Sequence, residues 1–385
     1  MNDMKQTAFV FGAGKTGRGF AAHLAHKGGY RIILVDKDAS LIEHLGMAGK
    51  YTVEVLGAPA LNCTIHPEKV FHIDGDWISD FIHTRLIFVS VFGNNLEALS
   101  KPFARGVAAW LEKNSGTHLN IITCENFLNA ANWLREKISL HLNAREQEEL
   151  NRRVGFSEAI VLSTCLAANY PESLTVRAQN FFELPCDGDA LKGEWPRVRG
   201  LKPLPNFGRQ LQRKIFTYNC INAVITYLGA EKGYTQLYEA GNDPEILVHA
   251  RRAALETSQA QVREYGFDRD EQRKWVDAAF SKFADKDIPD PIERNGADPV
   301  RKLGVNDRLV GPALLATKHG IVAEGLTGAI IAAFHFHDKK PDYSIAHTIR
   351  EKGLDHVLQQ ICGLSPGGKL FTMLKERYIR TRQDD

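Results

Sequence analysis

Residues 7–19 read Thr-Ala-Phe-Val-Phe-Gly-Ala-Gly-Lys-Thr-Gly-Arg-Gly, a short apolar run that passes directly into a glycine-rich segment. An apolar run of this length ended by glycines is typical of a buried parallel β-strand. A helical pattern follows from Gly19 and stops at Gly28-Gly29. Strand, glycine turn and helix, in this order, are the context in which Gly-x-Gly-x-x-Gly binds a dinucleotide.

Each glycine of the motif has a physical task. Gly12 allows the tight turn, Gly14 lets the backbone approach a pyrophosphate, and Gly17 lets helix and strand pack closely. The free N–H groups and the dipole of the following helix then favour phosphate groups. The predicted cofactor-binding residues of this segment are Phe11, Gly12, Ala13, Gly14, Lys15, Thr16, Gly17, Arg18 and Gly19.

An acidic residue, Asp36, ends the second predicted strand, which starts at Arg31. A carboxylate at this place accepts hydrogen bonds from the adenosine ribose and repels the 2′-phosphate of NADP, so NAD is the expected cofactor. Lys37 next to it weakens that preference. A phosphate-binding P-loop is excluded, because Phe9 occupies the position where that loop needs its first glycine.

The rest of the first half alternates between strand and helix patterns. Further strands are predicted at 31–36, 86–91 and 119–124, and helices at 96–113 and 130–142. Strand-like segments at 157–162 and 173–176 are expected to extend the same sheet. This alternation predicts a doubly wound parallel sheet.

From about residue 205 the pattern becomes helical throughout. Helices are predicted at 207–228, 244–265, 269–283, 309–318, 325–336 and 346–362, and the Gly- and Pro-rich stretch 184–205 is interpreted as a linker. The predicted fold is therefore an α/β Rossmann-type, doubly wound parallel sheet domain at residues 1–200. A mainly α-helical domain is predicted to follow at 201–385.

Composition excludes several classes of protein. A net charge of +2 over 385 residues provides no global field for nucleic acid or a membrane surface. The most apolar late stretch, 320–336, contains Glu324 and is too short for a membrane span. Six scattered cysteines without zinc spacing indicate free thiols in a reducing compartment and no metal site. With no signal-peptide pattern in the first residues, a cytoplasmic location is expected.

Three polar residues lie on the first helix of the second domain. At 100° per residue, Asn219 is about 140° and Asn222 about 80° from Lys214, so the three share one broad face. One interpretation is a snorkelling lysine with two asparagines that bond to the neighbouring backbone. The other is catalytic: a desolvated lysine accepts the proton of an alcohol, and amides donate to the developing oxyanion.

A basic segment follows at 294–308. Arg294, Arg301, Lys302 and Arg308 form either a solvated surface paired with nearby acids or a clamp for a sugar phosphate. Arginine forks match phosphate oxygens, which makes the clamp chemically reasonable.

Several long blocks of the chain resemble the polyol-specific long-chain dehydrogenases and reductases, the mannitol dehydrogenase family. The matching blocks are Phe-Gly-Ala-Gly-Lys-Thr-Gly-Arg-Gly-Phe at 11–20, Ile-Ile-Thr-Cys-Glu-Asn at 121–126, and the segments 213–229, 264–268, 293–312 and 332–336. They run nearly end to end in the order of the family, so the resemblance is specific.

The resemblance implies roles for individual residues. Lys214 matches the lysine acid/base, and Asn219 and Asn126 match the two oxyanion donors. The family has a histidine where this chain has Asn222, and that histidine orients substrate and lysine. This departure leaves the identity of the substrate open.

The resemblance also implies the reaction: NAD-dependent interconversion of a polyol phosphate and a ketose phosphate, foremost mannitol 1-phosphate and fructose 6-phosphate. Two alternatives stay open. One is a related reductase of a free polyol or a sugar acid such as tagaturonate, and the other is a catalytically degenerate NAD-binding sensor. The expected partner is a small sugar substrate, without nucleic acid or membrane, and the expected state is a monomer or weak homo-oligomer.

Overall fold

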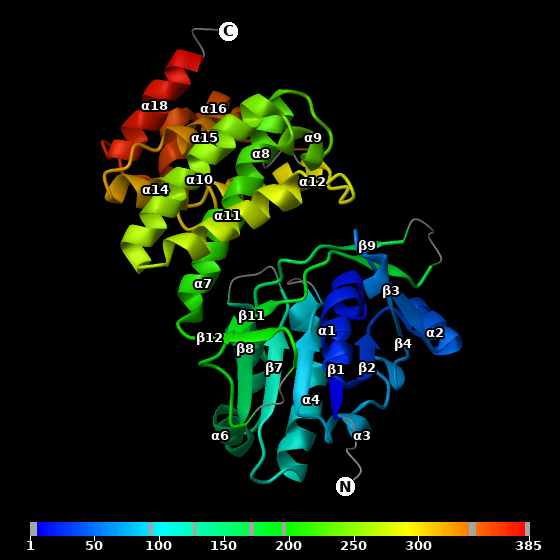
Figure 1. Ribbon diagram of the computed structural model, residues 1–385. Coiled ribbons are helices and arrows are strands. Elements are labelled where there is room, and N and C mark those ends of the chain that lie inside the picture. The colour runs from blue at the N-terminus through cyan, green and yellow to red at the C-terminus, as the bar shows by residue number, and fades with distance from the viewer. Residues whose placement is uncertain are drawn as a thin grey trace. The chain divides into compact units, whose positions relative to one another are not determined.

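The computed structural model describes residues 6–91, 95–125, 129–168, 173–194, 198–338 and 344–381 (Figure 1). Contacts within the chain group it into two compact units, Met1–Phe207 (unit 1) and Gly208–Asp385 (unit 2). The boundary predicted between residues 200 and 201 lies a few residues before this division. None of the helices among the described residues has the length and apolar character needed to cross a membrane.

Unit 1 is built on a six-stranded sheet in the order β5-β2-β1-β6-β7-β8. Its strands are β1 (Thr7–Phe11), β2 (Arg31–Asp36), β5 (Lys69–His72), β6 (Leu86–Val89), β7 (Leu119–Thr123) and β8 (Val154–Glu158). All neighbouring pairs are parallel. The predicted doubly wound parallel sheet is confirmed.

The sheet reverses its winding beside β1. From β1 the chain proceeds through β2 to β5 on one side, and then through β6, β7 and β8 on the other. Ligands of such sheets bind at this switch point, outside the carboxyl ends of the strands. The glycine segment follows β1 and therefore lies at this point.

Alternate residues of the strands face two separate cores. Val10 and Leu34 lie in the core that contains Phe20, and Phe9 and Ile33 lie in the core that contains Trp110. Because both faces are covered, the strands are continuous apolar runs rather than alternating patterns. The helices of unit 1 are α1 (His23–Lys27), α2 (Ala39–Ala48), α3 (Ile78–Phe81), α4 (Leu96–Lys113), α5 (Ala130–Ser139) and α6 (Ala144–Arg153).

A second sheet contains the segment that was predicted to extend the first. Its order is β4-β3-β10-β9, with β3 (Tyr51–Val55), β4 (Cys63–Ile65), β9 (Cys165–Ala167) and β10 (Val176–Ala178). The prediction that 173–176 extends the main sheet was wrong, because β10 lies in the second sheet and pairs with β3 and β9. A run of three residues does not reveal its partner strand. The prediction for 157–162 was only partly right, since β8 joins the main sheet but covers 154–158.

The stretch predicted as a linker is folded. It holds a parallel pair, β11 (Leu184–Asp187) and β12 (Leu201–Leu204). The side-chain amide of Asn120 bonds to both the N–H and the C=O of Lys192, which attaches this stretch to the main sheet. The linker interpretation was wrong because Pro185 and Pro203 lie within the paired strands, and Gly193 and Gly200 lie in the bend and turn between them.

Unit 2 is mainly helical, as predicted. Its helices are α7 (Phe207–Lys214), α8 (Cys220–Glu231), α9 (Leu237–Gly241), α10 (Pro244–Tyr265), α11 (Arg269–Phe283), α12 (Ile292–Gly296), α13 (Pro299–Lys302), α14 (Val310–Lys318), α15 (Glu324–His335), α16 (Ile345–Lys352), α17 (Leu354–His356) and α18 (Lys369–Thr381). Helix α8 contacts α9, α10, α12 and α15 and is buried on most of its circumference. Such a helix is apolar all round.

Local signals set several helix ends in unit 2. Asp243 caps α10, and Gly266 ends it in the left-handed region at φ 70°. Asp268 caps α11 in the same way. The single helix predicted at 346–362 is instead interrupted at Gly353, whose φ of 87° is incompatible with a right-handed helix.

Candidate functional site

The glycine segment of unit 1 makes the tight turn that its sequence predicts. Gly12 has a φ of 94°, and a Cβ atom there would lie 2.0 Å from the carbonyl oxygen of Ser90. A Cβ atom at Gly17 would lie 1.7 Å from the carbonyl oxygen of Gly12. The helical segment starts at Lys15, four residues earlier than predicted, and runs through a π-helical stretch, Gly17–Ala22, into α1. At Gly12 and Gly17 the fold therefore needs glycine for steric reasons.

Gly14 differs from the other two glycines of the motif. A Cβ atom there would meet no atom within 4 Å. Gly14 lines a pocket of about 290 Å³ together with Gly12, Asp36, Ser90 and Asn95. The backbone at Gly14 is thus open to close approach by a ligand.

Asp36 stands at the end of β2, on the wall of this pocket. One carboxylate oxygen accepts from the N–H of Ala13 at 2.6 Å, and the other accepts from the N–H of Asp38 at 3.0 Å. These bonds hold the carboxylate beside the glycine turn. A carboxylate oxygen has more than one acceptor site, so each oxygen can also bind a ligand hydroxyl.

Two charged members of the motif have different surroundings. Arg18 is buried, and its guanidinium donates to the carbonyl oxygens of Ala13, at 2.7 Å, and Leu174. Lys15 is exposed at the start of the helix. Arg18 therefore holds the glycine turn in place, while Lys15 is free to reach a ligand.

Two carboxylates that sequence reasoning missed lie at the carboxyl ends of β7 and β8: Glu125 follows β7 by two residues, and Glu158 is the last residue of β8. Glu125 is buried and accepts from the N–H of Val91 at 2.6 Å. Glu158 accepts from the N–H of Ala130, and burial raises its pKa to about 7. Glu125 directly follows the strand predicted at 119–124, which was an available signal, whereas Glu158 lay inside the segment predicted as a strand at 157–162. The predicted oxyanion donor Asn126 lies outside the described residues.

Lys214 ends helix α7 and is buried, with 9% of its surface exposed. Burial, followed by the positive charges of Arg308 and Lys282, lowers the pKa of Lys214 to about 7, and Asp307 opposes this shift. An amine with this pKa is divided between its neutral and charged forms near neutral pH. It can therefore accept or donate a proton, as an acid/base group must.

A π-helical turn, Ile215–Asn219, follows Lys214 directly. The N–H of Cys220 donates to the carbonyl oxygen of Ile215, five residues earlier, and to that of Thr217, but not to that of Phe216, four residues earlier. The angle of about 140° predicted between Lys214 and Asn219 was therefore wrong, because it assumed a regular α-helix. Residues five apart lie about one turn apart in a π-helix, so Lys214 and Asn219 share a face.

Asn222 lies one turn further and is half-buried. Its side-chain nitrogen donates to the amide oxygen of Asn295 at 3.1 Å. Asn295 belongs to α12, at the start of the basic segment. The structure thus connects Asn222 to the residue next to Arg294, within the basic segment.

Within the basic segment, Arg308 and Arg301 share one acid. Asp307 accepts from Arg308 at 2.7 Å and from Arg301 at 3.0 Å, and Arg301 also pairs with Asp298 at 2.8 Å. The side chain of Arg308 is 16% exposed, and its charge acts on Lys214. Of the four predicted clamp residues, Arg308 is therefore the one whose positive charge lowers the pKa of Lys214.

Lys302 and Arg294 have other partners. Lys302 is buried, its amine donates to the carbonyl oxygens of Asn295 and Ala297, and burial with the nearby Arg308 and Arg301 lowers its pKa to about 7. The side chain of Arg294 is 69% exposed and bonds to Asp290.

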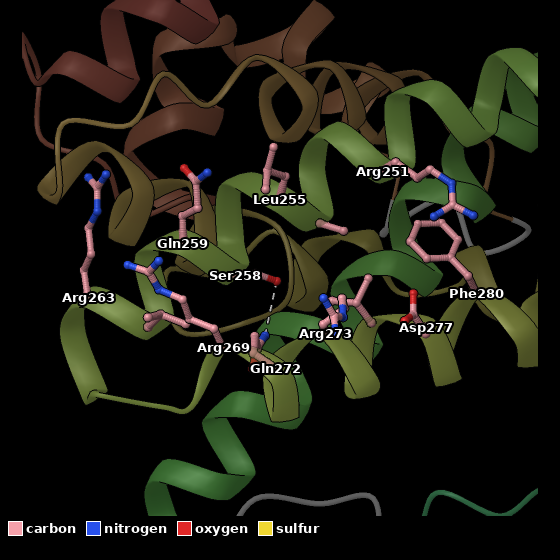
Figure 2. A pocket seen from close by; sticks show the side chains of 13 residues that line it. Arg251, Leu255, Ser258, Gln259, Arg263, Arg269, Gln272, Arg273, Asp277 and Phe280 are labelled. Atoms are coloured by element: carbon pink, nitrogen blue, oxygen red, sulfur yellow. Dashed lines mark hydrogen bonds between the residues drawn. The ribbon is translucent and has the colours of Figure 1, made fainter.

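Unit 2 contains a groove of about 570 Å³ between α10 and α11 (Figure 2). Arg251, Arg263, Arg269 and Arg273 stand around it, and Gln272 and Ser258 form part of its lining. Within the described ranges, His, Cys, Asp and Glu side chains form no group of three or more that could hold a metal ion.

Two family models match the chain in succession. The mannitol dehydrogenase Rossmann domain matches residues 6–200, and the mannitol dehydrogenase C-terminal domain matches residues 209–366. The two models together leave only the ends of the chain and a short junction unmatched.

Curated relatives cover nearly the whole length. A mannitol-1-phosphate 5-dehydrogenase of Bacillus subtilis (strain 168) is 30% identical over 380 residues, which are 96% of this chain and 99% of that protein. A protein of the same name from Bacillus velezensis is 31% identical over 367 residues, covering 93% of this chain and 95% of the relative.

Two solved structures share the fold. The mannitol 2-dehydrogenase of Pseudomonas fluorescens, a ternary complex with NAD and D-mannitol, matches with a TM-score of 0.72 and 16% identity, covering 99% of this chain and 93% of that one. A substrate-free D-sorbitol dehydrogenase matches with a TM-score of 0.81 and 12% identity over 99% of this chain and 94% of its own. Since both domain models match in order and the curated relatives align end to end, the chain belongs to the mannitol dehydrogenase family.

Proposed function

We propose that this protein is an NAD-dependent oxidoreductase that interconverts mannitol 1-phosphate and fructose 6-phosphate. The observation that carries the proposal is the buried Lys214, whose pKa of about 7 suits an acid/base group. It occurs in a member of a dehydrogenase family whose curated relatives at about 30% identity are named mannitol-1-phosphate 5-dehydrogenases.

NAD fits the pocket of unit 1. The open backbone at Gly14 can accommodate a pyrophosphate, the N-terminus of the helical segment that starts at Lys15 favours negative charge, and Asp36 can accept from ribose hydroxyls. When bound, NAD accepts hydride in polyol oxidation and its reduced form donates hydride in ketose reduction.

The residues of unit 2 handle the proton and the charge. In polyol oxidation, the substrate hydroxyl gives its proton to neutral Lys214 as its carbon loses hydride. In ketose reduction, the charged form of Lys214 returns the proton. Asn219, on the same face, donates to the oxygen while it has alkoxide character, and Asn126 is proposed as the second donor from the family resemblance.

The substrate phosphate is proposed to bind the basic segment. Arg308 is the main candidate, with Arg301 beside it, because Asp307 holds both guanidinium groups in fixed positions. An arginine fork bound to phosphate at this place would orient one end of an open-chain sugar relative to Lys214. Lys302 and Arg294 stay in the set of proposed clamp residues.

A parallel assay tests the proposed reaction. NADH oxidation is measured with fructose 6-phosphate, fructose and tagaturonate under one set of conditions. We expect the highest kcat/KM with fructose 6-phosphate. A higher value with fructose or tagaturonate would replace the phosphorylated substrate with a free polyol or a sugar acid.

Replacement of Asp36 tests the choice of cofactor. In the wild type, NAD should give the higher kcat/KM because the carboxylate repels the 2′-phosphate of NADP. Asp36→Ala should reduce the preference by about tenfold or more, since juxtaposed like charges cost several kcal/mol. Asp36→Asn keeps an acceptor oxygen for the N–H of Ala13. It therefore distinguishes the effect of losing the negative charge from the effect of losing the hydrogen bond to the glycine turn. Equal or better use of NADP by the wild type would refute the assignment.

Asn222→His tests the position at which the chain departs from its family. The imidazole restores bulk beside Lys214 and a group that can carry charge, so kcat/KM should shift toward fructose 6-phosphate relative to the other substrates. A change of roughly tenfold is expected, as for one altered contact in a substrate pocket. Asn295→Ala is the control, because it removes the bond to Asn222 without adding a ring.

The result of the Asn222→His experiment also bears on the sensor alternative. The wild type could be inert on a broad panel of polyols and sugar acids while Asn222→His gains activity. Asn222 would then be the residue that abolishes catalysis in this chain. The protein would then be an NAD-binding sensor on an enzyme scaffold.

We further propose a cytoplasmic protein that acts as a monomer or weak homo-oligomer. All six cysteines are free thiols, which fits a reducing compartment. Light scattering at two protein concentrations measures the oligomeric state.

A further inference from the structure

The π-helical turn after Lys214 changes the pairing of its backbone. In a regular α-helix the N–H of Cys220 would donate to the carbonyl oxygen of Phe216, but here it donates to those of Ile215 and Thr217. The hydroxyl of Thr257, on α10, donates to the Phe216 carbonyl oxygen at 2.8 Å in the buried interior. A side chain from another helix thus supports the altered turn.

Thr217, inside the π-turn, is held by two further side chains. Its hydroxyl oxygen accepts from the amide nitrogen of Gln261 at 3.0 Å and from that of Gln272 at 2.8 Å. Thr217 and Gln261 are fully buried, and Gln272 is 1% exposed. Buried polar groups are costly unless paired, so these bonds specify one geometry of the turn.

Gln272 contacts the chain on both sides of Lys214. Its amide oxygen accepts from the guanidinium of Arg213 at 2.8 Å, while its amide nitrogen donates to Thr217. The guanidinium only donates, so the oxygen of Gln272 must face Arg213 and its nitrogen must face Thr217. Figure 2 shows Gln272 and its bond to Ser258 at the groove between α10 and α11.

Arg213 is itself fixed. Its guanidinium lies over the rings of Phe267, at 4.7 Å, and Trp275, at 5.0 Å, measured to the ring centres. The residue before Lys214 and the residue three after it are therefore both anchored to α11 through Gln272. Lys214 lies between two fixed points.

We propose that Thr217 and Gln272 are positioning residues that keep the turn in its π form and thereby place Lys214 and Asn219 on one face. In a regular α-helix the two residues would be about 140° apart around the axis, at opposite edges of a broad face and no longer one above the other. The inference rests on the proposed function, in which the proton acceptor and the oxyanion donor act on the same oxygen atom.

The chain offers a matched control on the same run of helix. Thr226, on α8, is fully buried like Thr217, but its hydroxyl has no hydrogen-bond partner in the described part of the chain. Thr→Val replaces a hydroxyl by a methyl group of similar shape. Thr217→Val removes the two bonds, whereas Thr226→Val removes none.

Thr217→Val should also fold. The amide of Gln272 keeps Ser258 as an acceptor at 3.3 Å, and the amide of Gln261 keeps the hydroxyl of Thr257 at 3.2 Å. Neither buried amide nitrogen is left without an acceptor. The melting temperature of each variant verifies this.

The kinetic experiment compares wild type, Thr217→Val, Thr217→Ser and Thr226→Val in fructose 6-phosphate reduction over a range of pH. Thr217→Val should lower kcat by roughly 10- to 100-fold, the cost of a misplacement near 1 Å, with an unchanged KM for NADH. The apparent pKa in the pH dependence of its turnover should also shift, because the position of Lys214 relative to Arg308, Lys282 and Asp307 changes. Thr217→Ser should restore both quantities, and Thr226→Val should match the wild type.

A crystal structure of each variant supplies a measurement independent of activity. In Thr217→Val, the N–H of Cys220 should pair with Phe216 instead of Ile215, and Thr226→Val should keep the π-turn. If Thr217→Val keeps the π-turn, or keeps wild-type kcat and pH dependence, the positioning proposal is overturned. If instead Lys214→Met keeps wild-type turnover, the proposed function fails while the structural comparison still decides the role of Thr217.

Discussion

Lys214→Met is expected to lower kcat by roughly 10²- to 10⁴-fold, the usual contribution of general acid/base catalysis. The Kd for NADH should stay unchanged, because every predicted cofactor residue lies in unit 1. Stopped-flow turnover and a fluorescence titration with NADH measure the two quantities. A variant with wild-type turnover would remove Lys214 from the mechanism.

The same substitution should stabilise the protein. The pKa of Lys214 is about 7 in the folded state against 10.5 for the ordinary side chain, so between these pH values the unfolded state binds more protons. Burial of Lys214 therefore lowers the free energy of unfolding by its full amount below about pH 7. This destabilisation decreases as the pH rises toward 10.5. Its upper limit is about 5 kcal/mol, from 1.36 kcal/mol per pKa unit. Chemical denaturation at pH 6 and pH 9 should show a larger gain at pH 6.

The pH dependence of turnover should show the titration of Lys214 directly. In polyol oxidation, kcat/KM should fall below about pH 7 as Lys214 becomes protonated, and in ketose reduction it should fall above that value. Lys282→Met provides the control: it removes a neighbouring positive charge, so turnover should persist and the limb should move to higher pH. A limb that does not respond to Lys282→Met would point to another titrating group.

Arg308→Ala should weaken the use of phosphorylated substrates by about 2–4 kcal/mol, which is roughly 30- to 1000-fold in kcat/KM, because it leaves a bound phosphate without its charged partner. The loss with fructose should be much smaller. Measuring both sugars in one variant separates the phosphate contact from the effect of Arg308 on the pKa of Lys214, which both sugars experience.

Variants of the other basic residues test whether the effect on phosphorylated substrates is specific to Arg308. Arg301→Ala should show part of the same selectivity, because it shares Asp307 with Arg308. Arg273→Gln is the control outside the segment, since Arg273 is exposed and paired with Asp270. If Arg294, Arg301, Lys302 and Arg308 variants all affected both sugars equally, the phosphate clamp would be refuted.

Sequence patterns predicted those elements whose determinants are local. The bounds of β1, α4, α10 and α11 agree with the prediction to the residue. Apolar runs, capping aspartates and terminal glycines act within a few residues of each element, so the sequence around them is sufficient. The spacing of Gly12, Gly14 and Gly17 likewise predicted the turn and its open backbone.

The properties that make Lys214 a credible base depend on residues far along the chain. No local pattern predicts a π-turn at 215–219, since its support comes from Thr257, Gln261 and Gln272 on other helices. The pairing of β10 and the folded stretch 184–205 escaped prediction for the same reason: hydrogen bonds between distant segments set them.

The amino-acid sequence was thus enough for the doubly wound sheet, the helical second half and the identity of the candidate residues. The sheet and the helices follow from side-chain periodicity, and the cofactor residues from the glycine motif and Asp36, whereas Asn126 and the catalytic interpretation of Lys214 and Asn219 came from the resemblance to the family. The tertiary arrangement assigned Arg308 to Lys214, joined Asn222 to Asn295 and lowered the pKa of Lys214 to about 7. Burial and Coulomb interactions depend on distances through space, and chain folding sets those distances.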